Sequence, residues 1–210
     1  MRKIIRYAAF FILIAVVAYN SVYFKKLDEV KAGATSFNAA RYAGRFWETK
    51  LLPATSKAIE TGELLSLLKT DKGKAFADHS HALGIGNVKF FLIKGIGTVE
   101  SVEENQVLLK IEFQHEKSVL RIATEYIFGN AVRDASGAMD MNEFSNSMDF
   151  NNVSAEINKI IRDKVIPGFK SKVKKGDRIT FSGAIELNKE HTDLKRIEVI
   201  PVSLKIVDNI

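Results

Sequence analysis

The longest strand-like segment of the chain reads Val88-Lys-Phe-Phe-Leu-Ile-Lys-Gly-Ile-Gly-Thr-Val-Glu-Ser-Val102. It is apolar at every position from Phe90 to Ile93, which is typical of a strand buried on both faces. Gly95 and Gly97 interrupt the second half, and glycines inside a strand favour a tight bend of the backbone. The segment therefore predicts a long strand that curves around the corner of a barrel.

Four further strands are expected, each marked by apolar residues at alternating positions: residues 107–113, 120–128, 179–185 and 199–206. Between the second and third of these, Phe144 to Ile161 carries apolar residues on one helical face, and Pro167 is expected to close that helix. Residues 129–142 are expected to form a loop. The resulting order, β-β-β-α-β-β, is that of the OB-fold, a small five-stranded barrel.

A helical layer is expected ahead of the strands, over residues 36–83. Apolar residues recur at helical spacing from Phe37 to Leu51, and Pro53 is expected to end or kink this first helix. Two further helices are expected to begin at capping residues, Thr61 and Asp71. The predicted fold class is therefore α+β, with an OB-fold-like five-stranded barrel over 88–207 behind the helical layer.

The net charge of +6 is concentrated at the N-terminus. Residues 1–26 hold five of the 31 basic residues and no acidic one, so the remaining 26 bases nearly balance the 25 acids of the chain. A nucleic-acid-binding protein carries its positive charge on the folded domain, because phosphate contacts dominate its affinity. We therefore expect no nucleic-acid partner and assign the charge to a membrane-directed segment.

An uncharged, mostly apolar run from Tyr7 to Phe24 lies between the basic residues of this segment. Its length is at the short end of the range for a spanning helix. We expect residues 1–26 to be an uncleaved signal anchor, a single N-terminal transmembrane helix in the inner membrane, with residues 27–210 as a periplasmic domain. The alternative is a signal peptide cleaved after Ala18, where small residues stand at the usual spacing.

Several kinds of chemistry are excluded or unsupported. The sequence has no cysteine, which excludes disulfides, thiolate metal sites, a cysteine nucleophile and the lipid attachment of bacterial lipoproteins. His79 and His81 are two apart on a predicted helix, so they face different directions and do not form a metal-binding pair. No Gly-x-Ser-x-Gly or phosphate-binding loop is present. The sequence predicts no catalytic residue, no metal and no cofactor.

The most unusual loop is Gly129-Asn-Ala-Val-Arg-Asp-Ala-Ser-Gly137. Arg133 is a candidate for binding an anionic or hydroxyl-rich ligand, with Asp134 and Asn146 as further polar contacts and Trp47 as a candidate sugar-stacking surface. Two alternatives stay open. Arg133 and Asp134 can instead tie the loop to the barrel, and Trp47 can pack in the core.

The chain resembles a known family through five segments: Phe37-Asn-Ala39, Trp47-Glu48 with Lys50-Leu-Leu-Pro53, Lys94-Gly-Ile-Gly-Thr-Val99, Gly129-x-x-x-Arg133-Asp-Ala-x-Gly137 and Phe144-x-Asn146. The family is one of bacterial predicted periplasmic lipoproteins of unknown function, with genes often beside those of sugar ABC transporters. The resemblance runs from about Leu27 to Val207. It implies a periplasmic location and possible partners, ABC transporter subunits or carbohydrate, but no catalytic residue. Many members carry a lipobox cysteine that this chain lacks.

The leading functional hypothesis is a membrane-anchored periplasmic accessory or binding module, not an enzyme, associated with carbohydrate ABC transport. The charge balance favours an oligosaccharide over an oligonucleotide on an OB-like barrel. Two alternatives are a structural envelope protein without a ligand and a hydrolase that uses carboxylates not evident in the sequence.

Overall fold

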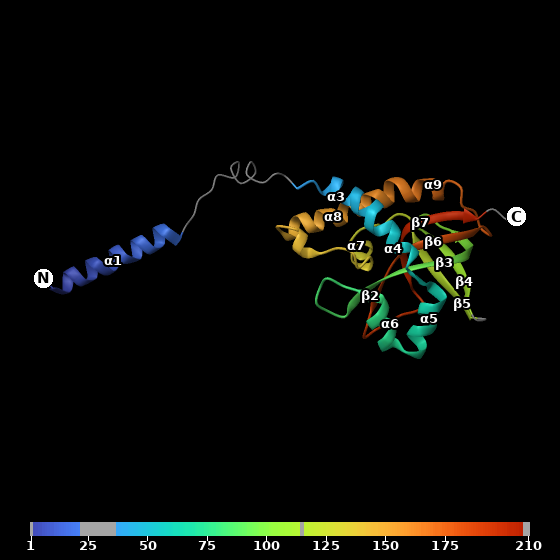
Figure 1. The fold of residues 1–210 in the computed structure, drawn as a ribbon, viewed down its shortest axis with the longest axis horizontal. Coiled ribbons are helices and arrows are strands. Elements are labelled where there is room, and N and C mark those ends of the chain that lie inside the picture. The colour runs from blue at the N-terminus through green and yellow to red at the C-terminus, as the bar shows by residue number, and fades with distance from the viewer. Residues whose placement is uncertain (1, 22–36, 114–115, 208–210) are drawn as a thin grey trace. The chain divides into compact units, whose positions relative to one another are not determined.

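The computed structural model describes residues 2–21, 37–113 and 116–207. The chain divides into two units, residues 1–37 and 38–210, and each is considered by itself (Figure 1). The first contains helix α1 (Arg2–Ser21). The second contains the helices α3 (Ala39–Phe46), α4 (Leu52–Ser56), α5 (Thr61–Thr70), α6 (Lys72–His79), α7 (Ala131–Ala135), α8 (Ser147–Ile160) and α9 (Ile166–Lys170), together with all of the strands.

Helix α1 covers most of the apolar run that the sequence assigns to the membrane. Among the described residues, however, no helix combines the length and the apolar character needed to cross a bilayer. The predicted transmembrane helix is therefore not found. The expected end of the anchor, Val22 to Lys26, lies outside the described residues.

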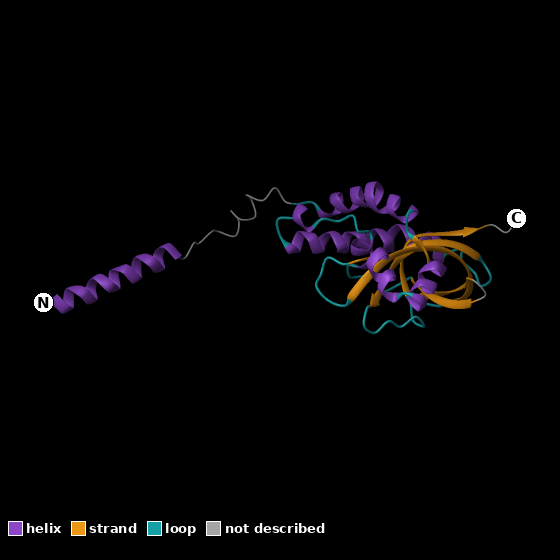
Figure 2. Cartoon of the chain, turned by 60° about the horizontal axis from the view of Figure 1, so that its bottom comes forward, coloured by secondary structure: helices purple, strands orange, loops and turns teal. Residues whose placement is uncertain are grey.

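Five strands close into a ring, which Figure 2 shows curling around the core. They are β3 (Val88–Val102), β4 (Gln106–Phe113), β5 (Glu116–Ala123), β6 (Arg178–Asn188) and β7 (Glu198–Val207). Around the ring the order is β3-β4-β5-β7-β6, and β6 pairs again with β3. Neighbours are antiparallel except β5 and β7, which are parallel. With α8 between β5 and β6, the predicted order β-β-β-α-β-β is confirmed.

Because β3 curves, its first part pairs with one strand and its last part with another. Its residues from Val88 to Thr98 pair with β6, and those from Thr98 to Val102 pair with β4. At Gly97 an added Cβ would lie 2.6 Å from the Leu109 side chain and 2.8 Å from the Lys110 carbonyl oxygen. Glycine is thus required where β3 passes from one neighbour to the other, as the sequence predicts.

The apolar core fills the ring and extends under two helices. Strand residues such as Phe91, Ile93, Leu109 and Ile122 are fully buried. Helices α5 and α6 add the buried residues Leu64, Leu65, Leu68, Ala75 and Phe76 to the same cluster. Burial of each leucine, isoleucine or phenylalanine side chain stabilises the fold by about 1.5–3 kcal/mol. Helix α3 lies instead beside α8, and α4 contacts β3, so the predicted helical layer does not pack together on one side of the strands (Figure 1).

Pro53, expected to end or kink its helix, and Pro167, expected to close its helix, both lie inside helical segments. Pro53 lies in α4, directly after a π-helical turn at Trp47–Leu51, and Pro167 lies in α9, directly after a π-helical turn at Ile161–Val165. A proline ring clashes with the carbonyl four residues earlier in an α-helix. The wider π turn, with hydrogen bonds across five residues, changes that spacing and lets the chain continue as a helix.

Three local predictions are wrong. The third strand ends at Ala123 rather than Phe128, because the chain bends at Thr124 and the alternating residues Tyr126 and Phe128 are exposed. Thr61 does not cap α5, since its hydroxyl donates to the Lys94 carbonyl oxygen at 2.8 Å. His81 lies not in a helix but in a short strand, β2 (Ser80–His81), which together with β1 (Ile59–Glu60) borders β3. The Asp71 cap is confirmed by its bond from the Lys74 amide.

Candidate functional site

The loop singled out by the sequence contains a short buried helix, α7, between two glycines. Gly129 and Gly137 have φ angles of +81° and +61°, which glycine adopts without steric cost. At Gly137 a Cβ would also lie 2.6 Å from the His81 ring. All five residues of α7 are buried. A helix of five residues is too short to show a periodic pattern, which is why the sequence predicts a loop here.

An ion pair lies at the centre of α7. Arg133 donates from Nε to Asp134 Oδ1 at 2.6 Å, and the two side chains are only 5% and 1% exposed. The other carboxylate oxygen accepts a hydrogen bond from Asn130 Nδ2 at 2.5 Å. A buried ion pair is tolerated only when further hydrogen bonds satisfy its remaining polar atoms. Asn130 contributes one of these bonds.

The Arg133 guanidinium is held from the opposite side by α8. Its Cζ lies 3.7 Å from the centroid of the Phe150 ring, and Nη1 donates to the Phe150 carbonyl oxygen at 3.5 Å. The Phe150 ring packs edge-on against Phe144 at 5.2 Å, and Phe144 packs edge-on against Tyr42 of α3 at 5.1 Å. A continuous aromatic row therefore connects Arg133 to the helical layer.

The far end of this row is a hydrogen-bonded tyrosine. The Tyr42 hydroxyl donates to Glu143 Oε2 at 2.5 Å, and the Lys50 ammonium lies 3.3 Å from Glu143 Oε1. Burial, together with the bond to the carboxylate, raises the pKa of Tyr42 well above its ordinary value. The donated hydrogen bond lowers the pKa of Glu143, and the Lys50 charge acts in the same direction.

This arrangement predicts a pH-dependent contribution to stability. Because the folded-state pKa of Glu143 lies below its unfolded value, the carboxylate stabilises the fold above the unfolded pKa, and that contribution is lost as the pH falls through the folded pKa. Glu143→Gln should lower the free energy of unfolding by about 0.5 kcal/mol at neutral pH, since the group is partly exposed. Urea denaturation at neutral and strongly acidic pH would show the difference vanishing in acid. Glu190→Gln, in an exposed loop, is the control, and an equal loss at both pH values would refute the linkage.

A hollow of about 550 Å³ opens beside α7, between the segment that follows β5 and the exposed side of α8. This size lies within the usual range for small-ligand sites. Its lining is rich in amide and guanidinium groups and comprises Phe128, Gly129, Asn130, Arg133, Asn151, Ser154, Ala155, Asn158 and Arg162. The sequence prediction did not include Asn151, Ser154 and Asn158 of α8 or Arg162 of the π-helical turn after it, although these residues recur at helical spacing beside the apolar face.

The polar groups of the hollow are held in fixed positions. Asn158 donates from Nδ2 to the Gly129 carbonyl oxygen at 2.8 Å, and Arg162 donates from Nη1 to the Ile127 carbonyl oxygen. Ser154 is 7% exposed, and its hydroxyl has no hydrogen-bond partner among the described residues. Buried polar atoms without a partner are uncommon in folded proteins. The hollow therefore offers both fixed donors and one unsatisfied hydroxyl.

An aromatic side chain stands at the rim of the hollow. Phe128 is 72% exposed, because β5 has already ended and the chain turns toward α7. Single exposed apolar side chains are common on protein surfaces, and Phe128 differs from them in lining a hollow that is otherwise polar. The hollow thus combines an accessible aromatic ring with hydrogen-bonding groups, and such a lining can bind a small polar molecule.

The structure brings two of the four predicted ligand residues together. Arg133 lines the hollow and pairs with Asp134. Asn146 is instead the N-cap of α8, where its Oδ1 accepts from the Asp149 amide at 2.8 Å. Trp47 is 7% exposed in the helical layer. A ligand role for these four residues stays a prediction, and Asn146 and Trp47 do not line the hollow.

The described residues contain no group of three or more His, Asp or Glu side chains that could hold a metal ion. His79 closes α6 and His81 lies in β2, so the two rings belong to different elements. His115 lies outside the described residues.

Comparison with known proteins supports the fold. The crystal structure of an OB-fold protein from Thermotoga maritima is similar to this chain with a TM-score of 0.74 and 26% sequence identity. The similarity covers 82% of this chain and 100% of the other. No curated protein matches the sequence. The fold is therefore that of an OB-fold protein with added helices.

The family is shown by sequence. A family described as "Predicted periplasmic lipoprotein (DUF2291)" matches residues 12–205, which contain the ring of strands, α7 and the hollow. The description names no enzymatic activity. Because the match extends over most of the sequence, this chain belongs to the family of predicted periplasmic lipoproteins.

Proposed function

We propose that the chain is a non-enzymatic binding module of the periplasm, and that the hollow between α7 and α8 receives a hydroxyl-rich ligand of the carbohydrate class. The observation that carries the proposal is the composition of this hollow. It joins an exposed phenylalanine ring, three asparagine side chains, two arginines and a buried serine hydroxyl that has no partner in the described part of the chain.

The chemistry of a sugar matches these groups. A pyranose ring presents a C–H face that packs on an aromatic ring, which Phe128 can supply, and hydroxyls that exchange hydrogen bonds with amides and Ser154. The charge of Arg133 is already balanced by Asp134, so a neutral ligand would not have to compensate a buried charge. In this arrangement Asp134 acts as a positioning residue that fixes the guanidinium of Arg133.

The proposal is tested by titrating the full chain with a panel of mono- and oligosaccharides in thermal-shift and calorimetric assays. A ligand that binds only the folded state raises the melting temperature. Phe128→Ala should raise the dissociation constant of the best ligand about tenfold, equivalent to about 1.4 kcal/mol. The matched control is Tyr126→Ala, because Tyr126 is also exposed, at 65%, but does not line the hollow.

A purely structural role is the second candidate, and the internal pairing of Arg133, Asp134 and Asn130 favours it. If no saccharide shifts the melting temperature, or if the two aromatic substitutions weaken binding equally, the carbohydrate proposal fails and the structural role stands.

Membership of the family supports a periplasmic, membrane-associated location. We propose that residues 1–26 direct export of the chain and that the domain assists carbohydrate uptake by an ABC transporter. The mass of the chain recovered from the periplasmic fraction tells whether cleavage occurs after Ala18. Affinity purification from detergent-solubilised membranes should recover sugar-transporter subunits, and their absence would contradict the transport association.

A further inference from the structure

Strand β7 has an edge with no partner strand among the described residues, which the helical segment Ile161–Lys170 contacts in part. It pairs with β6 from Val199 to Val207, but with β5 only at Glu198 and Val199, because β5 ends at Ala123. Among the described residues no strand pairs with the other side of Ile200–Val207. Pro201 lies in this part, and a proline inside a strand is tolerated at an edge or a bulge.

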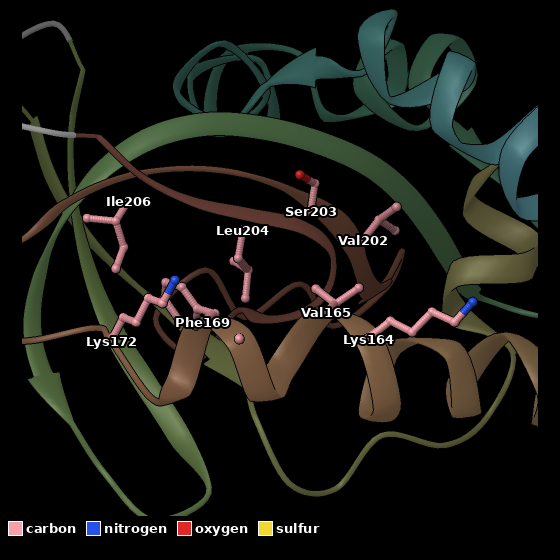
Figure 3. A pocket seen from close by; sticks show the side chains of 9 residues that line it. Lys164, Val165, Phe169, Lys172, Val202, Ser203, Leu204 and Ile206 are labelled. Atoms are coloured by element: carbon pink, nitrogen blue, oxygen red, sulfur yellow. The ribbon is translucent and has the colours of Figure 1, made fainter.

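A groove runs along this open edge. It has a volume of about 660 Å³ and lies between β7 and the helical stretch that ends in α9 (Figure 3). Phe169 and Val202 are buried at 4% and 2% and line it together with the half-buried Leu204. Lys164 and Lys172 are exposed on its helical side. The groove therefore has an apolar lining and a positively charged rim.

An open strand edge presents backbone N–H and C=O groups that can pair with a further strand. In strand addition, main-chain hydrogen bonds supply affinity, while pockets for alternate side chains supply specificity. Along β7, Val202, Leu204 and Ile206 alternate with Ser203 and Lys205, so one face of an added strand would meet apolar side chains. The lysines on the rim would attract acidic residues on that strand.

We propose that an extended acidic segment of a partner protein binds in this groove and adds a strand to β7. A second copy of the chain fits less well. Pairing of two β7 edges would bring Lys164, Lys172 and Lys205 of both copies together, and like charges at a contact are destabilising. The proposal concerns a surface separate from the hollow beside α7, and it does not depend on the carbohydrate ligand.

Glycine offers a way to close the groove without disturbing the fold. Gly168 lines the groove within α9, and a Cβ added there meets no atom within 4 Å. Gly168→Leu should therefore fill the groove while keeping or raising the melting temperature, since leucine favours helix more than glycine does. Gly44→Leu is the matched control, because Gly44 is also helical with open space at its Cβ but does not line the groove.

The test selects binders to the full chain from a displayed library of random decapeptides. Enriched peptides should be acidic with apolar residues at alternating positions. For these peptides Gly168→Leu, and separately Lys164→Glu with Lys172→Glu, should raise the dissociation constant at least about tenfold, while Gly44→Leu changes it less than about twofold.

Three outcomes would overturn the proposal. The first is that the unsubstituted chain enriches no peptides beyond those enriched by the Gly168→Leu chain. The second is that the enriched peptides lack acidic residues. The third is that the chain forms a dimer in analytical ultracentrifugation and that Gly168→Leu dissociates this dimer. The last outcome would assign the groove to a second copy of the chain.

Discussion

Asp134→Ala is expected to lower the free energy of unfolding by about 3–5 kcal/mol, because it leaves a buried charge without its partner. The Arg133 guanidinium is 5% exposed, and its Nε has the Asp134 carboxylate as partner. The substitution also removes the acceptor of the Asn130 side chain. Urea denaturation of the full chain, followed by circular dichroism, gives the change directly.

Two controls separate this effect from the general loss of a carboxylate. Asp163→Ala removes one member of an exposed ion pair with Lys159 and should change the free energy of unfolding far less than Asp134→Ala does. Combining Arg133→Met with Asp134→Ala removes both charges, and the double variant should be more stable than Asp134→Ala alone. A loss below about 1 kcal/mol for Asp134→Ala would mean that water reaches the guanidinium and that the pair is not buried in solution.

Gly97→Ala is expected to lower the free energy of unfolding by about 2–3 kcal/mol. Its Cβ would lie 2.8 Å from the Lys110 carbonyl oxygen, which is part of the neighbouring strand and cannot rotate away. β3 would have to move from β4 at the point where it leaves β6. The measurement is again the free energy of unfolding in urea.

Gly95→Ala is the matched control for Gly97→Ala, since it lies two residues away in the same strand. Its Cβ would lie 3.2 Å from the Phe181 ring and 3.3 Å from the Thr61 hydroxyl, contacts that side chains can relieve by small shifts. We expect a cost of about 1 kcal/mol or less. Equal costs at the two positions would contradict the assignment of the close backbone approach to Gly97.

The strands could be predicted because their apolar alternation reflects burial on one face of a sheet. Val107, Leu109 and Ile111 are buried, as their spacing predicts. The same alternation misleads at Tyr126 and Phe128, which are 65% and 72% exposed. The end of a strand depends on which neighbours remain to pair with it, and that information is absent from a local pattern.

The ligand role of the residues singled out in the sequence stays a prediction, and the structure shows only where they lie. The sequence singles out the Arg133-Asp134 dipeptide; Arg133 lines the hollow, and Asp134 pairs with it from behind. Asn146 stood out for the same reason, but a residue of this type before an apolar helix is also the usual N-cap, which is its place here. The role of Ser154 in the lining could not be predicted, because serine spacing in a helix does not reveal which neighbour covers it.

Because of the two π turns, the helices that contain them are sensitive to insertions and deletions as well as to substitutions. A π turn contains one residue more than the α-helical turn it replaces, and one residue corresponds to a rotation of about 100°. Deleting a single residue within Trp47–Leu51 would rotate everything after it relative to Phe46, turning Leu51 from the core and returning Pro53 to α-helical spacing. Substitutions in these turns change packing at one position, whereas an insertion or deletion changes the angular phase of a whole helix.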